Sequence, residues 1–158
     1  MSRLVEVLQP ASIRADRLGA TEPFAGLAWP DLELAAGILT ETLVERGARM
    51  TVQGRPSSKL WLILEGEALV SANARPIRVA SHGDLVGLTS MFYATNSPET
   101  TIALSSIRAF EAGPIEFRRL IKHRPIRQRL AAAAKNARFY DRLKVRPGEA
   151  GPKFPAST

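Results

Sequence analysis

The residues best suited to bind a small ligand lie near the middle of the chain, between Ser81 and Ala103. Gly87 follows a short apolar segment and precedes Leu88–Phe92, which is long enough for one or two helical turns. A glycine at such a strand-to-helix junction leaves backbone N–H groups that can bind an anion. The chemistry that this stretch offers is binding, and the sequence predicts a small-ligand site here.

Short strands on both sides would position this site. Between residues 43 and 110, β-type segments alternate with closely spaced turn signals. The apolar run Leu60–Leu64 ends in Glu65-Gly66 and predicts a strand buried on both faces. The predicted strands are Thr42–Glu45, Arg49–Val52, Lys59–Leu64, Ala68–Ser71, Pro76–Val79, Asp84–Val86, Thr100–Leu104 and Ile107–Phe110. The predicted fold is therefore mainly β with flanking helices, a double-sheet roll of the jelly-roll or double-stranded β-helix kind.

Helices are predicted before and after the roll. Pro30–Leu39 has proline where a first helical turn tolerates it. In Ser2–Leu18 the apolar residues are too loosely spaced to define a helix, and Pro10 interrupts them, so this stretch is left unassigned. Ile115–Ile121 places its large apolar residues on one helical face.

A longer helix is predicted from Pro125 to about Leu143. Its apolar and small residues recur at spacings of four and three, as in a heptad seam: Ile126, Leu130, Ala133, Ala137 and Tyr140. Its basic residues form a basic face: Arg124, Arg127, Lys135, Arg138 and Arg142. The seam predicts a homodimer, with packing against the roll as the alternative. The basic face predicts contact with nucleic acid or an acidic protein, with a solvated surface as the alternative.

The composition is that of one domain. The chain has 158 residues, 45% of them hydrophobic, and no cysteine, which excludes disulfides and thiolate metal sites. No signal peptide or membrane-spanning apolar run is present, so we expect a cytoplasmic protein. The charge is uneven. Residues 1–117 carry 10 Lys and Arg against 13 Asp and Glu, a net of −3, whereas residues 118–158 carry 12 against 2, a net of +10.

The chain resembles the cyclic nucleotide-binding domain of Crp/Fnr regulators, protein kinase A regulatory subunits and gated channels. Over residues 24–144 the matching residues are Gly47, Gly54, Leu60–Gly66, Gly83, Asp84, Gly87, Ala103, Phe117 and Pro125. The resemblance implies a short helical piece before the roll and a dimer helix after it. Because the sequence stops soon after that helix, we expect no helix-turn-helix domain of the kind that Crp/Fnr factors carry.

In relatives that bind cyclic AMP or cyclic GMP, the resemblance implies a glutamate for the ribose hydroxyl and an arginine for the cyclic phosphate. Leu88 stands at the glutamate position, and the arginine position falls on Ser97, Pro98 or Glu99. No Arg or Lys occurs between residues 83 and 107. A phosphate without a cation loses a contact worth roughly 1.5–3 kcal/mol, or roughly 10- to 150-fold in affinity. The sequence therefore predicts weak or no cyclic AMP binding and no resident cofactor.

We call residues 87–90 and 97–101 the ligand cassette. Its remaining polar groups suit a neutral or differently oriented ligand. They are the amides at Gly87 and the hydroxyls of Thr89, Ser90, Thr100 and Thr101. The alternative interpretation is that these are ordinary helix-cap and strand residues.

Catalysis has less support in the sequence. The metal-dependent cupins, which share a double-stranded barrel, need two or three histidines and a carboxylate at one cavity. This chain has only His82 and His123, on a turn and a helix, and no nucleophile-elbow or Ser-His-Asp pattern. No catalytic or metal-binding residue is predicted.

The sequence thus predicts a non-enzymatic, stand-alone regulatory domain, a sensor or interaction module, over residues 24–144. An N-terminal segment, 1–23, precedes it, and a Pro- and Gly-containing tail, 145–158, is expected to be disordered. The main alternative is a basic adaptor that contacts nucleic acid or an acidic protein through the C-terminal helix. A cupin-type enzyme is the least favoured alternative.

Overall fold

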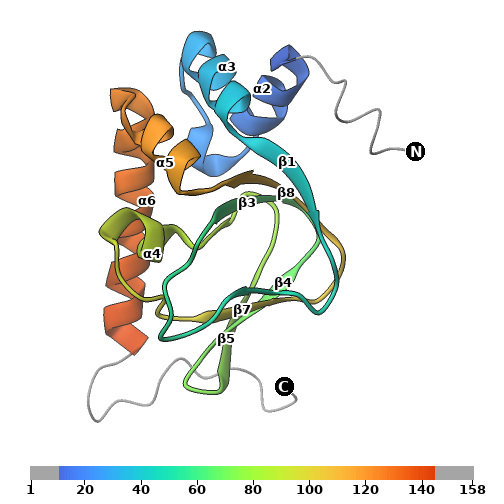
Figure 1. The fold of residues 1–158 in the computed structure, drawn as a ribbon, viewed down its shortest axis with the longest axis vertical. Coiled ribbons are helices and arrows are strands. Elements are labelled where there is room, and N and C mark those ends of the chain that lie inside the picture. Colours follow the sequence, from blue (N-terminus) through green and yellow to red (C-terminus); the bar gives the residue numbers. More distant parts are fainter. Residues whose placement is uncertain (1–10, 145–158) are drawn as a thin grey trace.

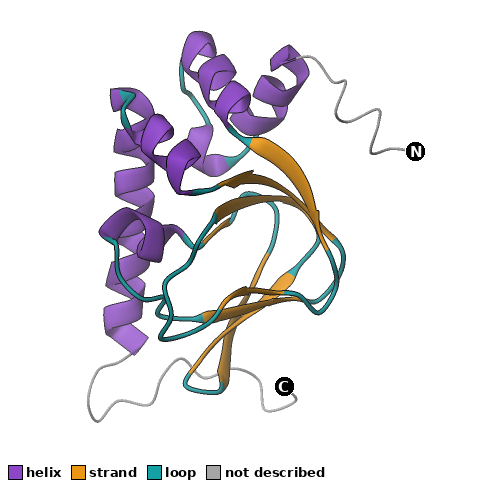
Figure 2. Ribbon diagram, in the orientation of Figure 1, coloured by secondary structure: helices purple, strands orange, loops and turns teal. Residues whose placement is uncertain are grey.

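A computed structural model describes residues 11–144, with side chains from residue 12 to residue 137. Two four-stranded antiparallel sheets form the roll, and the helices gather outside it (Figures 1 and 2). One sheet has the order β1-β8-β3-β6 and the other β2-β7-β4-β5. The strands are β1 Thr40–Val44, β2 Arg49–Thr51, β3 Leu60–Glu65, β4 Ala68–Ala72, β5 Arg75–Ala80, β6 Leu85–Val86, β7 Thr100–Ala103 and β8 Ile107–Ala112.

The helices cover one face of the first sheet and one side of the roll (Figure 1). They are α2 Ala11–Gly19, the 3₁₀ turn η1 Glu22–Phe24, α3 Trp29–Ile38, α4 Leu88–Tyr93, α5 Pro114–Ile121 and α6 Arg124–Lys144. The long helix α6 runs beside the roll (Figure 1), and α4 packs against both α6 and β3. The predicted mainly β roll with flanking helices is confirmed.

Strand β3 separates two apolar clusters, because successive side chains of a strand point to opposite faces. Leu60, Leu62 and Leu64 pack in the cluster that includes the helices. Trp61 and Ile63 pack in the cluster inside the roll. The continuous apolar run is therefore explained by burial on both faces, as predicted from the sequence.

Helix α2 lies in a stretch that the spacing of apolar residues in the sequence left unassigned. Its Ala15 and Leu18 are fully buried at helical spacing and join the helical cluster. Pro10 immediately precedes the first residue of α2, a position compatible with a helix start. Packing thus continues on the N-terminal side of the predicted domain boundary at residue 24, which itself stays a prediction. The predicted tail, 145–158, lies outside the described residues.

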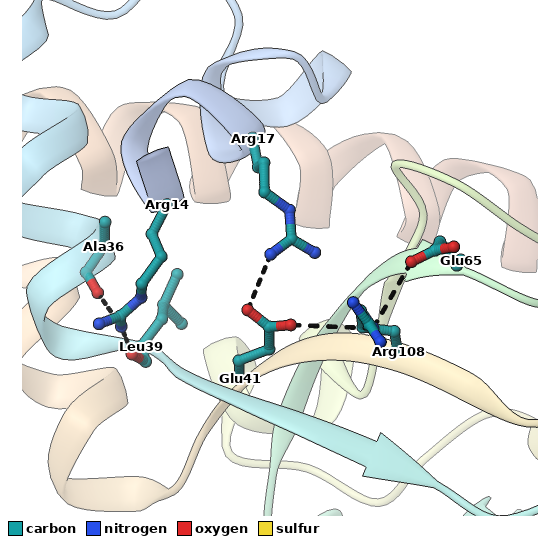
Figure 3. Close-up of polar contacts among 7 residues, drawn as sticks. All are labelled: Arg14, Arg17, Ala36, Leu39, Glu41, Glu65 and Arg108. Carbon is teal, nitrogen blue, oxygen red and sulfur yellow. Dashed lines mark hydrogen bonds and ion pairs between the residues drawn. The ribbon is translucent and has the colours of Figure 1, made fainter. Parts of the chain in front are cut away.

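Polar contacts attach α2 to the body of the domain (Figure 3). Arg14 donates to the carbonyl oxygens of Ala36 and Leu39, at the C-terminal end of α3. Those carbonyls have no partner within the helix, so the guanidinium satisfies acceptors that a helix end leaves open. Arg17 donates to the carboxylate of Glu41 on β1.

The predicted seam of helix α6 packs in part against the helix's own domain. Ile126 and Leu130 are fully buried in the helical cluster, together with Ala134. The assignment of Ile126 and Leu130 to a dimer seam is therefore corrected, since in this position of α6 they contact their own domain. Ala133 and Ala137 are half-buried, and the side chain of Tyr140 lies outside the described residues.

Candidate functional site

A pocket of about 490 Å³ is lined by residues of the roll, η1, α4 and α6. Its size falls within the usual range for small-molecule sites, roughly 300–1,000 Å³. Most of the cassette residues predicted from the sequence line it: Gly87, Leu88, Thr89, Ser90, Ser97, Pro98, Glu99 and Thr101. The ligand cassette is therefore assembled around one cavity, although its ligand-binding role stays a prediction.

Gly87 sets the approach of α4 to the roll. It precedes the helix with φ +87°, a left-handed conformation, and a Cβ at this position would clash with the carbonyl oxygen of Lys59. Ser90, in the first turn of α4, donates to the carbonyl oxygen of Thr95 and accepts from the amide of Ser57 at 2.7 Å. These contacts hold the first turn of α4 against the strand that follows Ser57.

Ser97 has an unusual environment for a buried serine. It is 4% exposed, and within the described part of the chain its hydroxyl has no hydrogen-bond partner. Its backbone is fully used, because its amide donates to Arg55 at 2.7 Å and its carbonyl accepts from Gly54 at 2.9 Å. Buried polar atoms normally have partners, so an unsatisfied hydroxyl that lines a pocket is a candidate ligand contact.

The second sheet contributes a row of side chains to the pocket. Thr51 pairs with Thr101, Thr101 with Val70, and Val70 with Arg78. Directly opposed residues of antiparallel strands share one face, so all four side chains project to the same side of the sheet. Thr51, Thr101 and Arg78 line the pocket, and Val70 is buried in the cluster inside the roll.

Thr100 is the one cassette candidate that does not line the pocket. Its neighbour Thr101 points inward, so Thr100 points to the other face of β7, where its hydroxyl accepts from the Gln53 amide at 3.0 Å. We therefore remove Thr100 from the candidate ligand residues. Leu88 lines the pocket but is 4% exposed and packs in the helical cluster, so its side chain contributes to the core.

Two arginines that sequence reasoning did not place at the site reach this pocket. Arg78 comes from β5, and its guanidinium forms a bidentate ion pair with Glu99 at 3.0 and 3.2 Å. Arg129 comes from α6 and donates to the carbonyl oxygen of Pro23 in η1 at 3.3 Å. Neither lies in the cassette segment, which is why a search for cations between residues 83 and 107 missed them.

Other predicted functional residues lie away from the pocket. Arg124, Arg127 and Lys135 of the predicted basic face are exposed, whereas the side chains of Arg138 and Arg142 lie outside the described residues. His82 and His123 do not line the pocket. Among residues 11–144, no group of three His, Asp or Glu side chains is arranged to hold a metal ion.

No helix in the described part of the chain is long and apolar enough to cross a membrane.

Comparison with known proteins identifies the fold. No protein-family model and no curated protein matches this chain. Among solved structures, the regulatory domain of Toxoplasma gondii PKA with cAMP has a TM-score of 0.70 and 17% identity, over 82% of this chain and 50% of that one. The Thermus thermophilus catabolite activator protein has a TM-score of 0.65 and 20% identity, over 76% and 59%.

An enzyme also contains the fold. A cAMP-binding acyltransferase from Mycobacterium smegmatis has a TM-score of 0.60 and 23% identity, over 82% of this chain and 42% of that one. This chain thus spans about half the length of each of these three proteins. The chain has the fold of a cyclic nucleotide-binding domain.

Proposed function

We propose that this chain is a non-enzymatic regulatory domain that senses a small molecule in the pocket between the roll, α4 and α6, and that it is not a conventional cyclic AMP receptor. The unsatisfied Ser97 hydroxyl at the pocket wall supports this function most directly. A ligand that accepts or donates a hydrogen bond there would satisfy a group that otherwise costs about 1–3 kcal/mol to bury.

The composition of the cassette supports the departure from cyclic AMP recognition. Ser97, 4% exposed, lies where the resemblance places the phosphate-binding arginine, and Leu88, packed in the core, lies where it places the ribose-binding glutamate. Arg78, the cation on the roll side of the pocket, already binds the carboxylate of Glu99. We therefore expect the ligand to differ from cyclic AMP in charge or orientation.

A thermal-shift screen on the unmodified protein tests the proposal. The panel contains cyclic mononucleotides, cyclic dinucleotides and the corresponding uncharged nucleosides, with cyclic AMP as the reference compound. A ligand that binds only the folded state raises the melting temperature in a concentration-dependent way. A hit that Ser97→Ala weakens supports the site, whereas a hit that Ser97→Ala leaves unchanged places binding elsewhere.

A second candidate function, a basic adaptor, is favoured by the surface of α5 and α6. Arg118, Arg119, Lys122, Arg124, Arg127 and Lys135 are all exposed. No acidic residue occurs from Phe117 to Lys135 to offset them. Such a surface attracts polyanions with little sequence preference. In this alternative the surface contacts nucleic acid or an acidic protein, and the pocket plays no part.

A homodimer stays part of the proposal, with a different interface from the predicted seam. Because Ile126 and Leu130 are buried by their own domain, a second copy that binds along α6 would contact its exposed side. Cytoplasmic localisation likewise remains an expectation from the sequence.

A further inference from the structure

Arg78 and Glu99 meet at the wall of the pocket, although the strand of Arg78 and the strand that Glu99 precedes are not neighbours. Arg78 is on β5, Glu99 immediately precedes β7, and β4 lies between these two strands. The contact is bidentate, with Nη1 to Oε2 at 3.0 Å and Nη2 to Oε1 at 3.2 Å. Carboxylates and phosphates bind a guanidinium with the same fork geometry. Glu99 therefore holds the positions on Arg78 that the anionic group of a ligand would otherwise take.

Glu99 is held through both its backbone and its carboxylate. The Thr51 hydroxyl donates to the Glu99 carbonyl oxygen at 3.0 Å, which fixes the backbone beside the pocket. Arg78 holds the side chain, and the Glu99 side chain is 17% exposed against 45% for Arg78. Glu99 is thus the more shielded partner of the pair. An anion that binds the Nη1–Nη2 edge of Arg78 has to displace this carboxylate first.

The charged side chains that line the pocket, taken together, do not favour binding of an anion. Three carboxylates, Glu22, Asp84 and Glu99, and two guanidinium groups, Arg78 and Arg129, line it, a formal sum of −1. Arg129 lies on the α6 side, where it donates to the Pro23 carbonyl oxygen. The Ser97 hydroxyl, in contrast, offers a neutral hydrogen-bonding group.

We propose that Glu99 is the specificity-determining residue of this pocket: by occupying Arg78 it excludes nucleotides and other anions and leaves the pocket to an uncharged polar ligand. This inference rests on the proposed function of the pocket as a ligand site. Glu99 acts here as a built-in substitute for the anionic group of a ligand. Its removal should convert Arg78 into an anion-binding residue.

Calorimetric titration with cyclic AMP, used as an anionic probe of known charge, tests the inference. Glu99→Gln keeps the shape of the side chain and removes its charge, so Arg78 becomes available to the cyclic phosphate. We expect Glu99→Gln to bind cyclic AMP about tenfold or more tightly than the unmodified protein, since a charge-assisted contact is gained. The double variant Arg78→Gln/Glu99→Gln should lose this gain.

Glu22→Gln is the matched control. It removes one carboxylate from the same pocket, and so makes the same change in net charge, but Glu22 makes no ion pair with Arg78 in the described structure. We expect Glu22→Gln to change cyclic AMP binding by less than about threefold, because an exposed charge acts weakly through solvent. An equal gain in Glu22→Gln and Glu99→Gln would overturn the assignment to the Arg78–Glu99 pair.

Two further outcomes would overturn the inference. One is low-micromolar binding of cyclic AMP, or of another anion from the screen, by the unmodified protein. The other is an identical response of Glu99→Gln and the unmodified protein up to the solubility limit of cyclic AMP.

The proposed function is judged separately by the thermal-shift screen. A hit there without a gain in Glu99→Gln refutes only this inference, and a gain in Glu99→Gln without any hit refutes only the ligand-sensing role of the natural pocket.

Discussion

Arg17 of α2 donates a hydrogen bond of 2.9 Å to Glu41 of β1, and this contact joins the first described helix to the first strand (Figure 3). The Glu41 side chain is only 9% exposed, and its second oxygen lies 3.8 Å from Nε of Arg108. Arg108 in turn lies 3.5 Å from Glu65, whose side chain is 69% exposed. One shielded carboxylate and one exposed carboxylate therefore share the same arginine.

These two carboxylates should contribute very differently to stability. We expect Glu41→Ala to lower the free energy of unfolding by about 1–3 kcal/mol, because it removes a shielded partner from two guanidinium groups. Glu65→Ala, the matched control, should cost less than about 1 kcal/mol, since exposed ion pairs contribute little. Urea unfolding measures both, and equal losses would contradict the importance of burial at Glu41.

Alanine substitutions at Gly87 and Gly47 distinguish the energetic cost of backbone strain from that of a steric clash. Both have φ +87°, but an added Cβ meets Lys59 and Ser57 at Gly87 and nothing within 4 Å at Gly47. Gly47→Ala should cost about 1–2 kcal/mol for the left-handed conformation alone. Gly87→Ala should cost more and should also abolish the thermal shift of any pocket ligand, because α4 has to move. Similar losses of stability for the two variants would show that α4 adjusts without strain.

Ser90 and Ser97 are both 4% exposed, yet of their two hydroxyls only that of Ser90 has a hydrogen-bond partner among the described residues. Ser90→Ala should destabilise the protein by about 1–3 kcal/mol, because it leaves the Ser57 amide and the Thr95 carbonyl without their partner. Ser97→Ala should be neutral or slightly stabilising in the absence of ligand, since no hydrogen bond is lost. Thermal unfolding of the two variants checks this. A large loss of stability in Ser97→Ala would contradict the interpretation that the Ser97 hydroxyl has no partner until a ligand binds.

Leu130 tests whether the apolar side of α6 serves the core or a dimer. Leu130→Ala should lower the free energy of unfolding by about 2–5 kcal/mol, the usual range for a large-to-small change in a core. Arg127→Ala, an exposed change on the same helix, should stay within about 0.5 kcal/mol. If light scattering instead shows that Leu130→Ala turns a dimer into an equally stable monomer, the burial of Leu130 within its own chain is refuted.

The basic surface on α5 and α6 is expected to bind polyanions independently of the pocket. Changing Arg118, Arg119 and Arg127 together to Gln should leave the melting temperature nearly unchanged and abolish salt-sensitive retention on heparin or DNA. The matched control changes three exposed arginines of the roll, Arg46, Arg49 and Arg75, with the same loss of charge. Equal retention of the two triple variants would show that retention depends on the net charge of the protein. The basic surface of α5 and α6 would then not be a specific binding site.

The sequence by itself determined the roll and the place of the cassette. The strand β3 is recognisable because five consecutive apolar residues, Leu60–Leu64, are needed where both faces of a strand are buried. Gly87 is recognisable because it stands between an apolar strand segment and a short helical segment, where a glycine leaves backbone N–H groups available. Local patterns of this kind depend only on neighbours in the chain. They do not show which distant side chains share a cavity.

Tertiary structure alone decided the chemistry of the pocket and the use of α6. Arg78 faces Glu99 only because β5, β4 and β7 pair in a register that aligns Arg78, Val70 and Thr101 on one face. The apolar side of α6 could have met a second copy, but the helical cluster covers Ile126 and Leu130 within the chain. Both outcomes depend on contacts between residues far apart in sequence. The sequence of an apolar helix face or of an isolated arginine does not show which surface will pack against it.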